Sequence, residues 1–173
     1  MILLLDFLIK ILIYIIPMYI ANSGAMLFGG KTPFDLNIKF IDGKPIFGPG
    51  KTFKGTSIGI GLGTASAFLL EYFFPALTAG ISPHFLLLGF ALSIGAILGD
   101  MAGSFFKRRN NIPRGTEVLF LDQLDFVIGG MILGTIYYLP GFWEALLIGA
   151  ATIIIHKMTN YLAFKIKLKK VPW

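Results

Sequence analysis

The chain of 173 residues contains no cysteine. Disulfide bonds and thiol chemistry are therefore excluded, and cysteine usage gives no indication of the redox compartment. Charge is also scarce, because Asp, Glu, Lys and Arg make up 14% of the residues while 55% are apolar. Soluble domains average about 25% charged residues. This composition excludes an ordinary soluble domain and indicates an integral membrane protein.

Long apolar runs separate the few charged residues, and they approach the ~20 residues that a helix needs to cross a bilayer. The first run could be a signal peptide, but it has no cationic start and no clear cleavage site, so a retained span is favoured. We predict an all-α integral membrane protein that forms one membrane-embedded domain over residues 1–173. Five transmembrane helices are expected at about 3–21, 56–77, 83–104, 124–139 and 142–164.

The positive residues are distributed unevenly between the connections. Lys and Arg concentrate in the loop at 22–55, in the connector at 105–123 and in the tail, and they are absent from the turns at 78–82 and 140–141. The positive-inside rule then predicts an outside N-terminus, a cytoplasmic C-terminus and an active site built from cytoplasmic loops. The net charge of +6 is compatible with anionic lipids or an anionic substrate, and we expect no nucleic-acid partner.

Three acidic residues stand close together in an otherwise apolar part of the chain. Asp100 lies at the cytoplasmic end of the third predicted span, and Asp122 and Asp125 are i, i+3 neighbours at the start of the fourth. Neighbouring carboxylates repel one another and are costly near a bilayer, and a divalent cation would offset both effects. Because Mg²⁺ prefers oxygen ligands, we predict that these three residues bind Mg²⁺. The structural alternatives are a helix cap at Asp122 and an Asp100–Arg108 ion pair.

A polar stripe continues from Asp100 along the same helix face. Ser104, Lys107 and Arg108 lie four, seven and eight residues after it. The connector adds Arg114 and Gly115. We expect this stripe to bind phosphate groups.

A second candidate segment is GPGKTFKG at 48–55. Its glycines would let backbone amides approach a phosphate, and Lys51 and Lys54 supply positive charge. A Walker A site is rejected, since Pro45 occupies the position of its first glycine and no strand–helix unit is available. The alternative is a plain cytoplasmic loop, in which the alternation at 37–41 and the Asp42-Gly43 turn allow a short hairpin.

Together these motifs resemble a known family. Asp100, Ser104, Lys107-Arg108 and Asp122-x-x-Asp125 resemble the signature of the phosphatidate cytidylyltransferases. The loop resembles that family's Lys-Lys-Thr-Trp-Glu-Gly segment at Lys51, Thr52, Phe53 and Gly55. The short chain, FGGKTPFD at 28–35 and the Arg114-Gly115 pair are similar to the archaeal branch, CDP-archaeol synthase.

The resemblance implies a Mg²⁺-dependent nucleotidyltransferase at the cell membrane. Its substrates would be CTP and a phosphorylated isoprenoid glycerol ether lipid (bis-geranylgeranylglycerol phosphate), and its products CDP-archaeol and pyrophosphate. The residues expected to carry this reaction are Asp100, Lys107, Arg108, Asp122 and Asp125, with Lys51, Thr52, Lys54, Gly55, Ser104, Arg114 and Gly115 binding substrate.

Three other functions stay open at this stage. A CTP-dependent lipid kinase would release CDP in place of pyrophosphate. A small multi-span transporter would use intramembrane charges as a pathway. A non-enzymatic membrane scaffold would not bind CTP. Membrane lipids are expected neighbours, and a homo-oligomer is compatible with the sequence. We assign no site role to His84 or His156, although His156 lies deep in the fifth predicted span.

Overall fold

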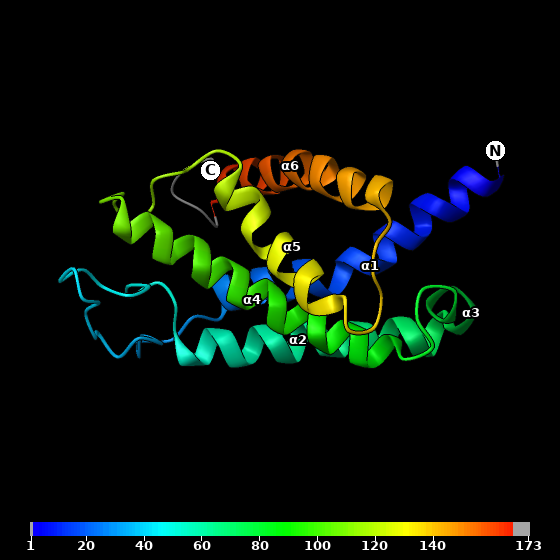
Figure 1. The fold of residues 1–173 in the computed structure, drawn as a ribbon, viewed down its shortest axis with the longest axis horizontal. Coiled ribbons are helices and arrows are strands. Elements are labelled where there is room, and N and C mark those ends of the chain that lie inside the picture. Colours follow the sequence, from blue (N-terminus) through cyan, green and yellow to red (C-terminus); the bar gives the residue numbers. More distant parts are fainter. Residues whose placement is uncertain (1, 168–173) are drawn as a thin grey trace.

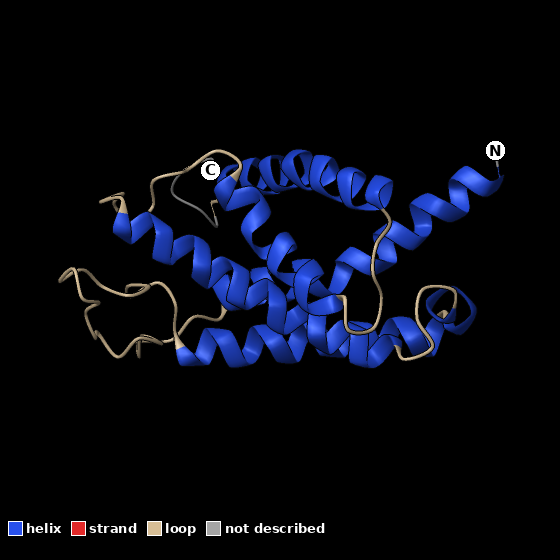
Figure 2. Ribbon diagram, viewed as in Figure 1, coloured by secondary structure: helices blue, strands red, loops and turns tan. Residues whose placement is uncertain are grey.

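The computed structural model describes residues 2–167, with side chains from residue 5 onward. This part of the chain contains six α-helices and, apart from two isolated bridges, no β-structure (Figures 1 and 2). The all-α prediction is therefore confirmed. The helices are α1 (Ile2–Leu27), α2 (Phe53–Phe73), α3 (Pro75–Ala79), α4 (Phe85–Arg109), α5 (Leu121–Gly134) and α6 (Phe142–Lys165).

Among the described residues, three helices are long and apolar enough to cross a membrane. These segments are Leu5–Leu27, Phe85–Arg109 and Phe142–Lys165. The predicted span at 124–139 corresponds to the shorter α5, which ends at Gly134. Within the predicted span at 56–77 the helix is interrupted, because α2 stops at Phe73 and the separate helix α3 begins at Pro75. Proline has no backbone N–H and clashes with the preceding turn, so the helix is interrupted there.

Close packing of α1 against α2 depends on glycines spaced four residues apart on α2. A Cβ atom placed on Gly59 would lie 2.5 Å from the carbonyl oxygen of Ala21, and one on Gly55 would lie 2.6 Å from that of Ala25. A second series on α4, from Gly95 to Gly103, faces α5 in the same way, and a Cβ on Gly99 would overlap the backbone of Asp125. Small residues at this spacing let membrane helices approach until their backbones touch.

Helix α6 lies across the outside of this four-helix core (Figure 1). Buried residues make up 61% of the most apolar stretch of α4 but 17% of that of α6. Its contact with the core includes the fully buried Ile148 and Thr152. α6 is therefore the most exposed of the long apolar helices.

The loop between α1 and α2 is ordered around Asp35. Its carboxylate accepts N–H bonds from Asn37 (3.1 Å), Phe47 (2.9 Å) and Gly48 (2.8 Å). Burial pushes the pKa of Asp35 upward, but these backbone donors outweigh it and hold the pKa below its usual value.

The tip of the same loop is close to the hairpin that the sequence allowed. An isolated bridge joins Lys39 and Pro45, and Gly43 adopts a positive φ of 75° at the turn. Asp42 forms a 3.1 Å ion pair with Arg109 at the end of α4. The loop is thus fastened to the helix end that carries the basic connector.

Candidate functional site

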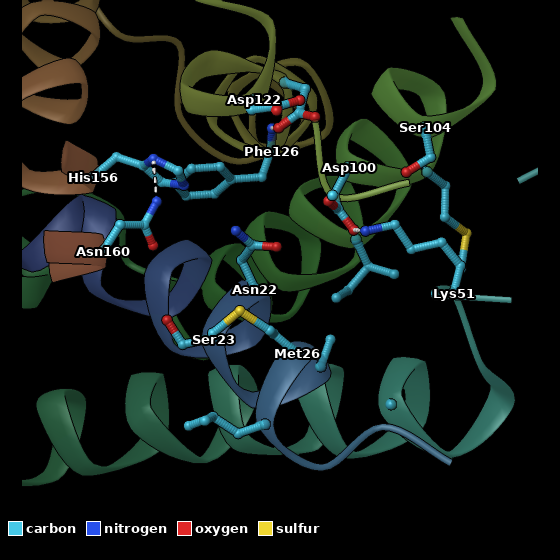
Figure 3. A pocket seen from close by; sticks show the side chains of 18 of the residues that line it. Asn22, Ser23, Met26, Lys51, Asp100, Ser104, Asp122, Phe126, His156 and Asn160 are labelled. Carbon is cyan, nitrogen blue, oxygen red and sulfur yellow. Dashed lines mark hydrogen bonds and ion pairs between the residues drawn. The ribbon is translucent and has the colours of Figure 1, made fainter. Parts of the chain in front are cut away.

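The ends of α1, α2, α4, α5 and α6 enclose a cavity of about 510 Å³ (Figure 3). Lysines, aspartates, amides and a histidine line it together with apolar side chains. Of the twelve residues predicted for the site, the cavity is lined by Lys51, Thr52, Gly55, Asp100, Ser104, Lys107, Arg114, Gly115, Asp122 and Asp125.

One side of the cavity holds two ion pairs. Lys51 Nζ lies 2.5 Å from Asp100 Oδ2, and Lys107 Nζ lies 2.8 Å from both carboxylate oxygens of Asp122. We call these four residues the charged wall. The partner of Asp100 is thus Lys51 from the loop and not Arg108 of the same helix, the alternative considered from the sequence.

Asp122 is held in place by the connector as well as by Lys107. Its Oδ2 atom accepts the N–H of Val118 at 3.0 Å, and Lys107 Nζ also donates to the carbonyl of Thr116 at 3.0 Å. These bonds join α4, the connector and α5 at one point. The geometry sets the position of the carboxylate before any ligand binds.

Asp125 lies deeper, where α4 and α5 touch. The absence of a side chain at Gly103 leaves room for its carboxylate, which a Cβ there would overlap. The N–H of Phe126 donates to its Oδ1 atom at 2.6 Å. Within residues 2–167, no three acidic, histidine or cysteine side chains converge closely enough to form a complete metal site. The three predicted metal ligands share one cavity, but they do not form a three-carboxylate cluster.

Thr52 and Gly55 have structural roles at the start of α2. Thr52 Oγ1 accepts the N–H groups of Gly30 (2.9 Å) and Gly55 (3.1 Å), which caps the helix. Since both bonds use the oxygen as acceptor, the hydroxyl proton of Thr52 is left to donate to a ligand.

Two predicted residues do not line the cavity. Lys54 packs beside Gly30, and the side chain of Arg108 lies near Gly48. The Nε atom of Arg108 is buried without a hydrogen-bond partner among the described residues. The catalytic role predicted for Arg108 and the substrate-binding role predicted for Lys54 stay predictions.

The sequence interpretation missed the opposite side of the cavity, which α1 and α6 form. Asn22, His156 and Asn160 line it, and we call these three residues the neutral wall (Figure 3). Asn160 Nδ2 lies 3.2 Å from His156 Nδ1. A usable signal existed, because His156 and Asn160 are polar residues four apart in an otherwise apolar helix and so share one face.

Several known proteins resemble this chain over most of its length. The family described as CarS-like: CDP-archaeol synthase matches residues 4–173. A CDP-archaeol synthase of Saccharolobus islandicus is 40% identical over 169 residues, which cover 97% of each chain. That of Methanocaldococcus jannaschii is 42% identical over 166 residues, covering 92% of this chain and 94% of the relative.

A solved structure described as an intramembrane enzyme for archaeal membrane lipids biosynthesis has a similar fold. It is 33% identical, has a TM-score of 0.77, and the match covers 86% of this chain and 90% of the other. Family match, sequence identity and fold thus agree over nearly the whole length. The chain belongs to the CDP-archaeol synthase family.

Proposed function

We propose that this membrane protein is a cytidylyltransferase that converts CTP and a phosphorylated isoprenoid glycerol ether lipid into CDP-archaeol and pyrophosphate. Its relatives carry the name of this activity. The observation that carries the proposal is the charged wall, where two lysines and two aspartates face one cavity at helix ends.

The reaction joins two polyanions. An oxygen of the lipid phosphate attacks the α-phosphorus of CTP, and the bond to the β-phosphate breaks, so that pyrophosphate leaves with the electron pair. The nucleophile is already an anion, so the site needs no strong general base. It needs groups that bring the two phosphates together and stabilise the charge of the leaving pyrophosphate. Lys51 and Lys107 supply that charge inside the cavity.

The donor set fits Mg²⁺. Asp100, Asp122 and Asp125 offer carboxylate oxygens to one cavity, and the first two already hold a lysine cation at 2.5 and 2.8 Å. A metal that keeps one or two carboxylates and takes its other ligands from substrate phosphates needs no complete protein cage. When bound, Mg²⁺ would polarise phosphoryl oxygens and neutralise their charge.

The remaining predicted residues would then orient the phosphates. Lys51 and Lys107 bind phosphate oxygens, and the hydroxyl groups of Ser104 and Thr52 donate hydrogen bonds to them. Arg114 and Gly115 line the cavity from the connector. We keep Lys54 and Arg108 in supporting roles, because their side chains pack beside Gly30 and Gly48 of the loop.

We further propose that residues 1–173 form one domain with five membrane spans. One span consists of α2 together with α3, and the other four are α1, α4, α5 and α6. The cavity then faces the cytoplasm. The Lys-rich loop, the basic connector and the C-terminal end of α6 lie at one end of the bundle, and α3 lies at the other (Figure 1). This arrangement supports an outside N-terminus under the positive-inside rule.

The absence of native cysteines makes the topology testable. Single cysteines at the exposed positions Lys39 and Ala79 would be treated with a membrane-impermeant maleimide in intact and in permeabilised cells. We expect labelling at 79 in intact cells and at 39 only after permeabilisation. The reverse pattern would refute the orientation, and equal labelling at both sites in intact cells would refute opposite sides.

Two differently labelled substrates test the reaction. Purified protein is given Mg²⁺, the ether lipid phosphate and CTP labelled at either the α- or the γ-phosphorus. We expect the α-label in the lipid and the γ-label in pyrophosphate. A γ-label in the lipid would identify a lipid kinase, and no label in any lipid would refute the proposal. A diacyl phosphatidate run in parallel tests the preference for the ether lipid.

A further inference from the structure

Glu117 is a fourth acidic residue of the cavity, and the reaction outlined above gives it no role. It lies in the connector between α4 and α5 and lines the cavity together with Asp100, Asp122 and Asp125. Asp100 and Asp122 each form an ion pair with a lysine. Within residues 5–167, no lysine or arginine forms an ion pair with Glu117. Its charge is therefore available to a ligand.

One oxygen of this carboxylate is held by the protein and the other is not. Gln123 Nε2 donates to Glu117 Oε1 at 2.7 Å, and Gln123 is fully buried. Among the described residues no group donates to Glu117 Oε2, and this atom is not buried. The carboxylate is thus oriented through Oε1, while Oε2 stays accessible to a ligand in the cavity.

The backbone on both sides of Glu117 is fastened to the charged wall. The carbonyl of Thr116 accepts a hydrogen bond from Lys107 Nζ at 3.0 Å, and the N–H of Val118 donates to Asp122 Oδ2 at 3.0 Å. Under the proposed function, Lys107 binds phosphate oxygens. Glu117 therefore lies beside the place where the phosphate groups of CTP would bind.

Few groups of the two substrates can hydrogen-bond to a carboxylate oxygen. A carboxylate only accepts hydrogen bonds, and it repels phosphate groups. The ether lipid phosphate carries no hydroxyl or amino group, because the other oxygens of its glycerol are ether oxygens. CTP offers such donors at its ribose hydroxyls and at the amino group of cytosine. The ribose adjoins the α-phosphate and the base lies beyond it, so the ribose is the part that meets a residue beside the phosphate site.

We propose that Glu117 binds the ribose of CTP, with Oε2 accepting a hydrogen bond from a ribose hydroxyl and Gln123 orienting the carboxylate. The inference rests on the proposed function. It gives Glu117 a role in nucleotide binding and in the selection of ribonucleotides over deoxyribonucleotides, and none in the chemical step. Acidic side chains bind ribose hydroxyls in the same way in dinucleotide-binding folds.

The test pairs a change in the protein with the matching change in the nucleotide. Wild-type protein and Glu117→Ala are assayed with CTP, 2′-deoxy-CTP and 3′-deoxy-CTP, with the ether lipid phosphate and Mg²⁺ saturating. In the wild type, the nucleotide without the bonded hydroxyl should have a KM about 10-fold or more above that of CTP, as for the loss of a hydrogen bond to a charged group. In Glu117→Ala the KM of CTP should rise to a similar value, and removing the same hydroxyl should then change the KM by less than about 2-fold. The KM of the lipid phosphate should not change.

Three further variants separate this contact from a general effect on the fold. Glu71 is an acid of α2 that does not line the cavity, so Glu71→Ala should leave the discrimination between CTP and the deoxynucleotides unchanged. Gln123→Met removes the donor to Oε1 and should raise the KM of CTP by a smaller factor than Glu117→Ala. If alanine at 117 prevents folding, Glu117→Gln serves in its place, because it keeps the shape of the side chain and removes the charge. We expect a smaller loss of discrimination in that variant.

The outcomes distinguish this inference from the proposed function. Wild-type protein that makes no CDP-lipid refutes the function itself. Active wild-type protein that accepts both deoxynucleotides as well as CTP refutes the ribose contact only, and so do Glu117 variants that discriminate as strongly as the wild type. A lost preference for CTP over UTP with ribose discrimination intact also overturns it, because Glu117 would then bind the base. A higher Mg²⁺ requirement with ribose discrimination intact overturns it as well, because Glu117 would then be a metal ligand.

Discussion

Helices α4 and α6 contribute to the same cavity in different ways. α4 is packed into the core against α5 and carries Asp100 and Lys107. α6 lies outside that core, with far fewer buried residues, and carries His156 and Asn160. Two of the charged groups therefore stand on the most buried of the long apolar helices, and two of the neutral polar groups stand on the most exposed one.

The difference has a physical reason. Charges that stabilise a transition state act best when they are already in position, and backbone-to-backbone helix contact provides that rigidity. We expect substitutions on the charged wall to lower kcat/KM far more than substitutions of charged residues outside the cavity.

The largest effect is expected on the charged wall. Asp122→Asn removes a carboxylate that we assign to Mg²⁺ and breaks the ion pair with Lys107, so kcat/KM should fall at least about 100-fold. Assays with purified protein over a range of Mg²⁺ concentrations measure it. Asp100→Asn should lower kcat/KM by a similar factor.

The control is an aspartate with the same kind of partner outside the cavity. Asp42 pairs with Arg109 at the loop tip and does not line the cavity. Asp42→Asn should keep kcat/KM within about 2-fold, since exposed ion pairs contribute little. Near-normal turnover in both the Asp100 and Asp122 variants would contradict the metal assignment.

An intermediate effect, on thermal stability, is expected for substitutions that test how closely α1 and α2 pack. Gly59→Ala forces a methyl group against the backbone of Ala21, and overpacking of this kind costs about 1–3 kcal/mol. Gly61→Ala in the same helix meets nothing within 4 Å, so it should stabilise by about 0.4–1 kcal/mol. Thermal unfolding in detergent should show a lower Tm for the first variant and a higher Tm for the second. A similar shift in both would contradict close α1–α2 contact.

The smallest effect is local and depends on pH. Because the pKa of Asp35 is lowered in the folded loop, its contribution to stability is present above the unfolded pKa of about 3.9 and is lost as the pH falls through the lower folded pKa. Amide hydrogen exchange should show Phe47 and Gly48 losing protection as the pH falls through that range. Asp35→Asn should show low protection already at pH 6. Unchanged protection in that variant would contradict the carboxylate's role in the loop.

Much of the fold and of the charged wall could be predicted from the sequence. Apolar runs predicted the long helices, and the resemblance pointed to Asp100, Lys107 and Asp122, all of which line the cavity. The break between α2 and α3 was missed, because apolar residues continue past Phe73 although Pro75 interrupts the helix. Hydropathy reflects the apolar character of this stretch but not the interruption that proline imposes on a helix.

The neutral wall could not be predicted in the same way. Asn22 and His156 lie on different helices at opposite ends of the chain, and nothing local in either segment relates them. Only the arrangement of α1 and α6 brings both to one cavity. Single polar residues in apolar helices are ambiguous until the face that they occupy is known.

The sequence by itself determined that the protein is helical and membrane-embedded, and that its charges gather near helix ends. Hydropathy and charge belong to individual residues, so they can be read along the chain. Tertiary structure alone decided that Lys51 pairs with Asp100, that Lys107 pairs with Asp122, and that α6 completes the cavity. These pairings depend on how closely the helices approach, which the glycines permit but do not by themselves specify.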